Sequence, residues 1–235
     1  SSSRLEHPKG AILARIVPFR VTLRPIMENL ESAKRSAAAA ALELVEDGMA
    51  LGLGTGSTAK HLVQLLAERI HNTGLHVECC ATSRETADLA RSLGIEIFDL
   101  DDLGDLDLAI DGADEIDPAL NLVKGGGAAH FREKLVEKAA KRFAVIADNT
   151  KLVDKLGTTR QIPLEILPFA WRTTTRRIEA MGAKLTPRLS ADLEMLRTDN
   201  GNLIIDGDFG PLTDPARLAI ELDAQAEREL TARQR

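Results

Sequence analysis

The sequence predicts an α/β protein with two domains: a Rossmann-like domain built on a mostly parallel sheet, and a smaller α+β domain after it. The first prediction rests on short apolar segments that alternate with amphipathic helical segments up to about residue 160, a pattern typical of a parallel sheet covered on both faces. The second rests on a change of rhythm near residue 161, where the signals resemble a split βαβ (ferredoxin-like) unit. We therefore expect an N-terminal arm at residues 1–31, a Rossmann-like domain at 32–160 and a small domain at 161–235.

Capping residues and apolar spacing place the elements of the first domain. Ser32 can cap a first helix whose small apolar side chains share one face and which ends near Gly48. A second helix begins at the glycine-rich turn of residues 54–58, and Gly94 is the stop signal of a third. The third and fourth helices are expected at 84–93 and about 128–142, and the strands at 49–53, 75–81, 95–98, 106–110 and 143–147.

The second domain is marked by the same kinds of signal. Strands are expected at 164–167, 184–189, 195–198 and 203–206, with helices at 170–181 and from Pro215 toward the end. The turn at residues 199–202 joins the last two strands as a hairpin. The closing C-terminal strand of a split βαβ unit is not visible, so we expect an unpaired edge along 164–167.

Charge and composition exclude several classes of partner. The net charge is −6, so no broad basic face for nucleic acid is indicated. The chain has one Trp and no Tyr, which leaves no aromatic platform on which bases could stack. No apolar run approaches the roughly 20 residues that span a bilayer. We therefore expect neither nucleic acid nor a membrane as a partner.

The cysteines and the N-terminal arm bear on the compartment. Cys79 and Cys80 are adjacent, so on a strand they point to opposite faces, which suits neither a disulfide framework nor a zinc site. Two buried thiols indicate a reducing compartment, the cytoplasm or an organelle stroma. The first residues carry more basic than acidic side chains; they are the remnant of a transit peptide, a leftover of cloning or an ordered arm.

Polar segments follow the expected strands at the edge where ligands bind in open α/β sheets. These segments are residues 54–58, 82–83, 111–114 and 148–151, and all contain hydroxyl, carboxylate or lysine side chains. Because the carboxyl ends of parallel strands meet at one edge, the pattern predicts one shared polar cleft.

The glycine-rich turn has two interpretations. Its glycines allow the backbone to approach an anion, and the helix that follows offers free N–H groups and the hydroxyls of Ser57 and Thr58. It lacks both the GK[ST] of a Walker loop and the third glycine of a dinucleotide fingerprint. A tight turn with a capping hydroxyl explains it equally well. Lys34 could supply a cation for an anion, or could simply be solvated.

Two charged clusters follow. Three carboxylates, those of Asp111, Asp114 and Glu115, come directly after an apolar strand. They have three interpretations: a surface turn, a metal site that lacks histidine, or a functional cluster. Lys124 precedes three glycines that open a helix, which makes either a linker or a nest for an anion. On that helix the spacing predicts a buried face of Phe131, Leu135 and Ala139, with Glu133 turned toward solvent or a cleft.

Together these residues resemble a known family. The strings GLGTGSTA, DGADEID, KGGGAA followed by REK, and IADNTKLVDKLG occur in this order, with PFAWRT and TDNGN after them. They are similar to ribose-5-phosphate isomerase of the A type, from about Lys34 to Leu222. The resemblance implies cofactor-free, metal-free interconversion of D-ribose 5-phosphate and D-ribulose 5-phosphate, as in the pentose phosphate pathway or Calvin cycle. It also implies a homodimer or a larger homo-oligomer.

The resemblance assigns roles to individual residues. Glu133 matches the base that moves a proton between C1 and C2 through an enediolate. Lys124 and glycine N–H groups would stabilise that intermediate, and Asp111 or Asp114 would assist ring opening. The residues that match substrate-binding motifs are Lys34, Thr55, Gly56, Ser57, Thr58, Asp111, Gly112, Ala113, Asp114, Lys124, Gly125, Gly126, Gly127 and Lys151.

The chain departs from the family pattern after Leu222, where a charged tail replaces a glycine- and valine-rich stretch. This keeps open the alternative of a catalytically impaired homologue that binds sugar phosphates. A non-catalytic sensor is less compatible with Lys124 and Glu133 together. An acyl- or CoA-transferring enzyme would use a glutamate as a nucleophile, and a trapped covalent adduct would identify it.

Overall fold

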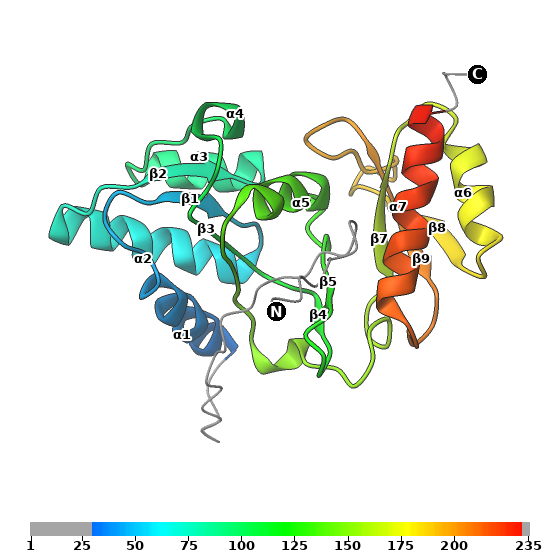
Figure 1. Ribbon diagram of the computed structural model, residues 1–235, viewed down its shortest axis with the longest axis horizontal. Helices are drawn as coiled ribbons and strands as arrows, with labels where there is room; N and C mark the ends of the chain where they lie inside the picture. Colours follow the sequence, from blue (N-terminus) through cyan, green and yellow to red (C-terminus); the bar gives the residue numbers. More distant parts are fainter. Residues whose placement is uncertain (1–29, 232–235) are drawn as a thin grey trace, which may run out of the picture.

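The computed structural model describes residues 30–231, and the expected arm at 1–31 lies almost wholly outside them. Two sheets stand apart from each other, with helix α5 (His130–Ala139) and a two-stranded ribbon between them (Figure 1). The mostly parallel sheet with helices on both faces, followed by a small antiparallel sheet, confirms the predicted fold class. The boundary at residue 160 stays a prediction.

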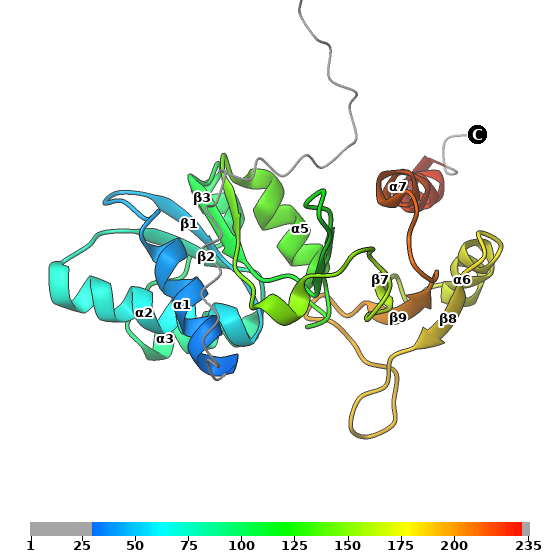
Figure 2. The same ribbon diagram turned by 90° about the horizontal axis from the view of Figure 1, so that it is seen from below.

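The first sheet has four parallel strands in the order β2-β1-β3-β6. Its strands are β1 (Ala50–Leu53), β2 (Glu78–Ala81), β3 (Leu108–Asp111) and β6 (Phe143–Val145). Helices α1 (Leu30–Leu42), α2 (Ser57–Thr73) and α3 (Arg84–Ser92) contribute to the core on one face, which Figure 2 shows as one group. Helices α4 (Leu100–Leu103) and α5 pack on the other face.

The alternation of side chains along the strands explains the two cores. Leu51 and Leu53 face the α1–α3 side, whereas Ala109 faces the α5 side. Cys79 and Cys80 are both buried and free, and each belongs to a different one of these cores. The prediction that the cysteines face opposite sides of a strand is therefore confirmed.

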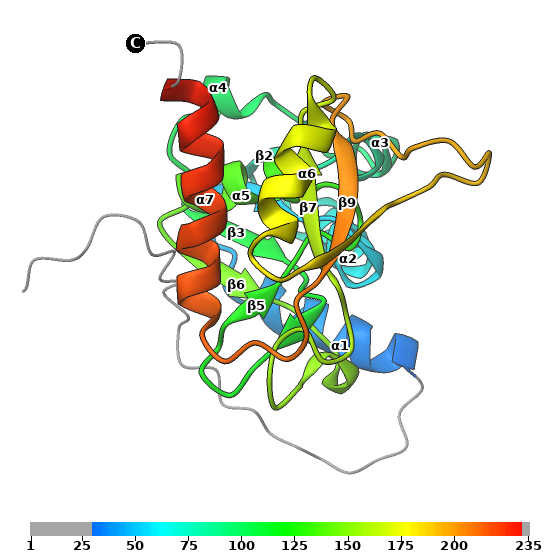
Figure 3. The ribbon, with the colours of Figure 1, turned by 90° about the vertical axis from the view of Figure 1, so that its right-hand side faces the viewer.

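The second sheet is antiparallel and has three strands in the order β7-β9-β8. These are β7 (Ile162–Ile166), β8 (Lys184–Pro187) and β9 (Leu203–Asp208), and α6 (Trp171–Glu179) and α7 (Pro215–Thr231) lie on one face (Figures 2 and 3). Ile166, Ile178 and Ile205 form the centre of its core. Within residues 30–231, β7 has β9 as its one strand partner.

Some expected elements differ in the structure. Residues 95–98 and 195–198 form isolated bridges rather than strands, because each has only one or two paired positions. Three short elements were not expected: α4, the 3-10 helix Asn149–Lys151, and the ribbon of β4 (Glu115–Ile116) and β5 (Leu122–Val123). The ribbon has two residues a strand, too few to show an alternating pattern.

The predicted buried face of α5 is wrong for two of its three residues, because only Ala139 packs against a core. Phe131 and Leu135 are 47% and 45% exposed, whereas Glu133 and Val136 are 4% exposed each. The reason is a close contact with β1, where a Cβ added at Gly52 would lie 2.4 Å from Val136 Cγ1. The glycine allows the Val136 face of the helix to approach the sheet, and Glu133 is turned inward, toward Lys124. Of the two expected surroundings of Glu133, solvent or a cleft, the structure excludes solvent.

No helix within residues 30–231 combines the length and the apolar composition that crossing a membrane would require.

Candidate active site

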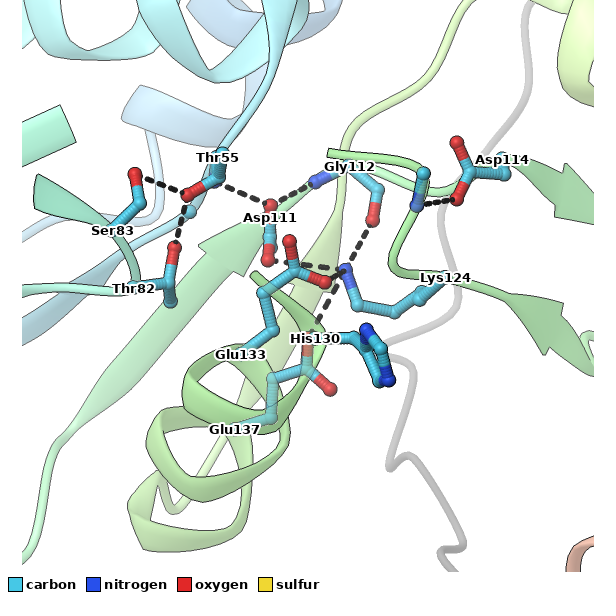
Figure 4. A network of polar contacts seen from close by, with 12 residues as sticks. Thr55, Thr82, Ser83, Asp111, Gly112, Asp114, Lys124, His130, Glu133 and Glu137 are labelled. Atoms are coloured by element: carbon cyan, nitrogen blue, oxygen red, sulfur yellow. Dashed lines mark hydrogen bonds and ion pairs between the residues drawn. The ribbon is translucent and has the colours of Figure 1, made fainter. Parts of the chain in front are cut away.

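The Lys124 ammonium lies at the centre of a cluster of three acidic side chains (Figure 4). Its Nζ donates to the carbonyl oxygen of Gly112 at 2.6 Å. The same atom is 3.1 Å from Asp111 Oδ2, 3.4 Å from Glu133 Oε2 and 3.1 Å from Glu137 Oε1. The structure thus brings together three of the predicted catalytic residues, Asp111, Lys124 and Glu133, and adds a fourth ionisable group.

Asp111 connects the end of β3 to the glycine-rich turn. Its Oδ1 accepts hydrogen bonds from the backbone N–H groups of Thr55 at 2.9 Å and Gly112 at 2.7 Å. A Cβ at Gly54 would lie 2.1 Å from this oxygen, so only glycine permits the approach. Asp111 is 1% exposed, and its second oxygen is left to face Lys124.

Asp114 lies next to the glycine run rather than next to Lys124. Its Oδ2 accepts from the N–H of Gly126 at 2.7 Å, and Arg188 Nη1 of the small sheet donates to the Gly126 carbonyl oxygen at 2.8 Å. Gly125, with φ of 95°, turns the chain there, a conformation that side chains other than glycine rarely adopt. A Cβ added at Gly127 would lie 3.4 Å from Thr55 Cγ2, so this glycine lies beside the glycine-rich turn.

The glycine-rich turn leads into α2 as predicted. Gly56 is the N-cap with φ of 113° and gives no side-chain hydrogen bond to the helix, so the first N–H groups of α2 have no cap from it. Ser57 is exposed and Thr58 is buried. Thr55 Oγ1 is hydrogen-bonded to the hydroxyls of Thr82 at 2.7 Å and Ser83 at 2.8 Å, which joins the ends of β1 and β2.

The two outlying lysines are less closely associated with this cluster. Lys34 is on α1, and its ammonium pairs with Glu31 at 2.6 Å. Glu31 is also 3.0 Å from Nε2 of His61, one helical turn after Ser57. Lys151 ends the 3-10 helix that follows β6, after Asp148, whose side chain caps that helix. Both lysines keep their predicted roles only as proposals.

Three acids around one cation, two of them buried and Glu137 half-buried, set the electrostatics of the site. Burial raises the pKa of Glu133 to about 8; Lys124 opposes this rise, and the charges of Asp111 and Glu137 add to it. Burial likewise raises the pKa of Glu137 to about 7 against the effect of Lys124. Burial alone would lower the pKa of Lys124, but the three acids outweigh it and the pKa is raised. Lys124 is therefore charged at neutral pH, whereas Glu133 titrates near it.

The same three acids have the geometry of a cation site. Oxygen atoms of Asp111, Glu133 and Glu137 lie within 4.8 Å of one another. The Lys124 ammonium stands among them and supplies the positive charge.

Sequence reasoning missed Glu137, although its signal was present. Glu133 and Glu137 are four residues apart, so on a helix they lie on the same face. It also missed Arg188, for which no local signal exists because its contact with Gly126 spans 62 residues.

Comparison with known proteins gives consistent matches. Residues 78–226 match the family described as ribose 5-phosphate isomerase A (phosphoriboisomerase A). A ribose-5-phosphate isomerase A from Chloroflexus aurantiacus is 50% identical over 202 residues, covering 84% of this chain and 83% of that protein. The structure of ribose 5-phosphate isomerase A from Methanocaldococcus jannaschii has a TM-score of 0.79 at 41% identity, covering 83% of this chain and 87% of that one. A D-ribose-5-phosphate isomerase in complex with phospho-erythronic acid has a TM-score of 0.81 at 40% identity, covering 84% and 87%.

Proposed function

The chain belongs to the ribose-5-phosphate isomerase A family and is an aldose–ketose isomerase, and we propose that it interconverts D-ribose 5-phosphate and D-ribulose 5-phosphate with Glu133 as the base. The observation that carries this proposal is a buried carboxylate 3.4 Å from a half-buried ammonium. Burial raises the pKa of that carboxyl to about 8, and a base is most effective when its pKa is near the working pH.

The proton transfers follow from this pair. The Glu133 carboxylate removes the proton from C2 of the open-chain aldose, and the C2–H electrons form the C1–C2 double bond of the enediolate. The Lys124 ammonium stabilises the negative charge that develops on O1, a contribution of about 100- to 1000-fold in rate for one such donor. The hydroxyl proton passes from O2 to O1, and Glu133 returns its proton to C1, which leaves the carbonyl at C2.

Other residues would position the substrate. The turn of residues 55–58 at the N-terminus of α2 suits the phosphate, and Lys34 would reach it by leaving Glu31. Asp111 is occupied by two backbone donors and Lys124, so it is suited to hold the ammonium in place. Asp114 is half-buried, and we propose that it transfers the hydroxyl proton that must move when the furanose ring opens.

The test is ketose formation from D-ribose 5-phosphate by the wild-type protein and by Glu133→Gln. The variant cannot accept a carbon-bound proton, so kcat should fall about 100- to 10,000-fold while calorimetric binding of the sugar phosphate persists. The exposed Glu179 at the end of α6 provides a matched control, and Glu179→Gln should keep the wild-type rate. A Glu133→Gln protein that retains more than about a tenth of the rate would exclude Glu133 as the base.

The same assay addresses the alternative of an impaired homologue. A wild-type protein that binds D-ribose 5-phosphate but forms no ketose would support the binding protein and refute the isomerase. The homo-oligomer and the reducing compartment stay predictions.

A further inference from the structure

The acidic cluster contains more acceptors than its cation can satisfy. An ammonium has three N–H donors, and Lys124 uses one for the Gly112 carbonyl oxygen. Two donors remain for Asp111, Glu133 and Glu137, all within 3.4 Å. The oxygen atoms that face Lys124 from these three acids are buried and have no other hydrogen-bond partner. Glu133 and Glu137 therefore compete for the same donors.

The charges are unbalanced as well. One ammonium faces three carboxyl groups whose side chains are 2%, 5% and 13% exposed for Asp111, Glu133 and Glu137. Fully ionised, the cluster would carry a net charge of −2, and like charges in a buried site disfavour ionisation. Glu137 is thus an additional negative charge, one helical turn from the proposed base, for which the reaction itself gives no role.

We propose that Glu137 is a positioning residue that shares the Lys124 ammonium with Glu133, so that the ion pair does not fully neutralise the base. This inference rests on the proposed function of Glu133. With Glu137 present, Lys124 is drawn toward three acids at once and remains available to the oxygen of an enediolate. Without Glu137, the ammonium would pair with Glu133 and Asp111 alone.

The groups around Glu137 give the sign of the effect. Three charged groups face Glu137. Lys124 lies in the segment after β5, Asp111 at the end of β3, and Glu133 on α5, the helix that also carries Glu137. His130 points to Glu165 of the small sheet, 3.9 Å away. Removal of the Glu137 charge takes away one cause of the raised pKa of Glu133 and strengthens its pair with Lys124. Both changes lower the pKa of Glu133.

The first measurement is the pH profile of kcat/KM for D-ribose 5-phosphate with wild type, Glu137→Gln and Glu137→Asp. In Glu137→Gln the acid limb should move to lower pH by about one unit, because a neighbouring like charge is gone. The plateau at high pH should fall about three- to ten-fold, because the base is weaker. Glu137→Asp keeps the charge and should stay closer to wild type, and Glu179→Gln should not differ from it.

The second measurement does not depend on turnover. The carboxyl carbon of Glu133, labelled with ¹³C and assigned by its absence in Glu133→Gln, is titrated by NMR in wild type, Glu137→Gln and Glu137→Asp. A lower midpoint in Glu137→Gln supports the proposal even if the protein forms no ketose, so this outcome is separate from failure of the proposed function. An unchanged Glu133 midpoint, or a rate reduced equally at every pH, overturns it. If Glu137→Gln does not fold, Glu137→Ala takes its place, because it also removes the charge: a lowered Glu133 midpoint supports the proposal and an unchanged one overturns it.

Discussion

Glu115 is the acid whose removal should cost the most stability. It begins β4 and is 0% exposed. Its Oε2 accepts from the N–H of Gly157 at 2.6 Å, and its Oε1 accepts from Thr159 N at 2.6 Å, Thr159 Oγ1 at 2.7 Å and Arg160 N at 2.8 Å. Residues 157–160 lead into β7, so this one carboxylate fixes the connection between the two sheets.

The magnitude follows from the donors that would lose their acceptor. A buried donor left unsatisfied costs about 1–3 kcal/mol. If two of the four find water in Glu115→Ala, the two that remain cost about 2–6 kcal/mol in the free energy of unfolding, which is large against the 5–15 kcal/mol typical of a domain. For a protein of this size the thermal midpoint should fall by roughly 4–24 °C.

A graded variant makes the prediction sharper. Glu115→Gln with its oxygen in the Oε1 position keeps three of the four hydrogen bonds and places an amide nitrogen against the N–H of Gly157. The loss should then be about 1–3 kcal/mol. The control is Glu96→Ala at an exposed position. A Glu115→Ala protein that melts within about 2 °C of wild type would show that the connection does not depend on this carboxylate.

The pH dependence has a definite sign. Burial acts to raise the pKa of Glu115, but the hydrogen bonds from Thr159, Gly157 and Arg160 outweigh it and lower the pKa. Stability from the ionised carboxylate is therefore fully present above the unfolded pKa, about 4.3, and is lost as the pH falls through the lower folded pKa. The difference in thermal midpoint between wild type and Glu115→Gln should shrink below about pH 4.

Two further predictions concern packing and burial. Gly54→Ala places a Cβ 2.1 Å from Asp111 Oδ1 and 2.6 Å from the Cα of Asp111, so the thermal midpoint should fall by roughly 2–12 °C, the cost of overpacking. The control is Gly127→Ala, whose Cβ meets only Thr55 Cγ2 at 3.4 Å. Its thermal midpoint should stay within about 2 °C of wild type. Equal thermal midpoints of Gly54→Ala and wild type in calorimetry would contradict this prediction. Burial raises the pKa of Cys79 to about 12 and of Cys80 to about 11, and the thiolate is the reactive form. Ellman's reagent should react with the native protein slowly and with the urea-unfolded protein at once, and rapid labelling of the native protein would contradict the burial.

Local signals predicted much of the fold. Ser83 caps α3 by accepting from Thr86 N at 3.1 Å, and Gly94 follows that helix with φ of 81°, as its expected stop. The cap and the stop each involve residues close together in the chain, so they can be recognised directly from the sequence. The alternation of apolar strands and amphipathic helices likewise needs only neighbouring residues, and the parallel sheet followed from it.

The orientation of α5 could not be read in this way. Phe131 and Leu135 are spaced for one apolar face, and burying them instead of Glu133 would cost no desolvation of charge. The structure buries Glu133 because Lys124, outside the helix, supplies the opposite charge and because Gly52 on β1 makes room for Val136. Both causes lie in other elements, and a period within one helix does not contain them.

The motif residues of the site are brought together only in part by local structure. Asp111, Lys124 and Glu133 meet because β3, the segment after β5 and α5 end or begin at one edge of the sheet. Lys34 has an acidic partner of its own on α1, Glu31, at a spacing of three residues that the sequence displays. The role of each residue stays a proposal, while the meeting of these three is an observation.

One contribution of the small sheet to this geometry is made at a single residue, Gly126. The N–H of Gly126 donates to Asp114 on the side of the first sheet, and its carbonyl oxygen accepts from Arg188 on the side of the second. Arg188 is itself held by Asp206 of β9, to which its Nε donates at 2.8 Å. Because donors stabilise a developing charge best when they need no reorganisation, a glycine nest fixed from both sides is more effective than one fixed from one side. The second sheet therefore bears on the proposed chemistry through the shape of the glycine run.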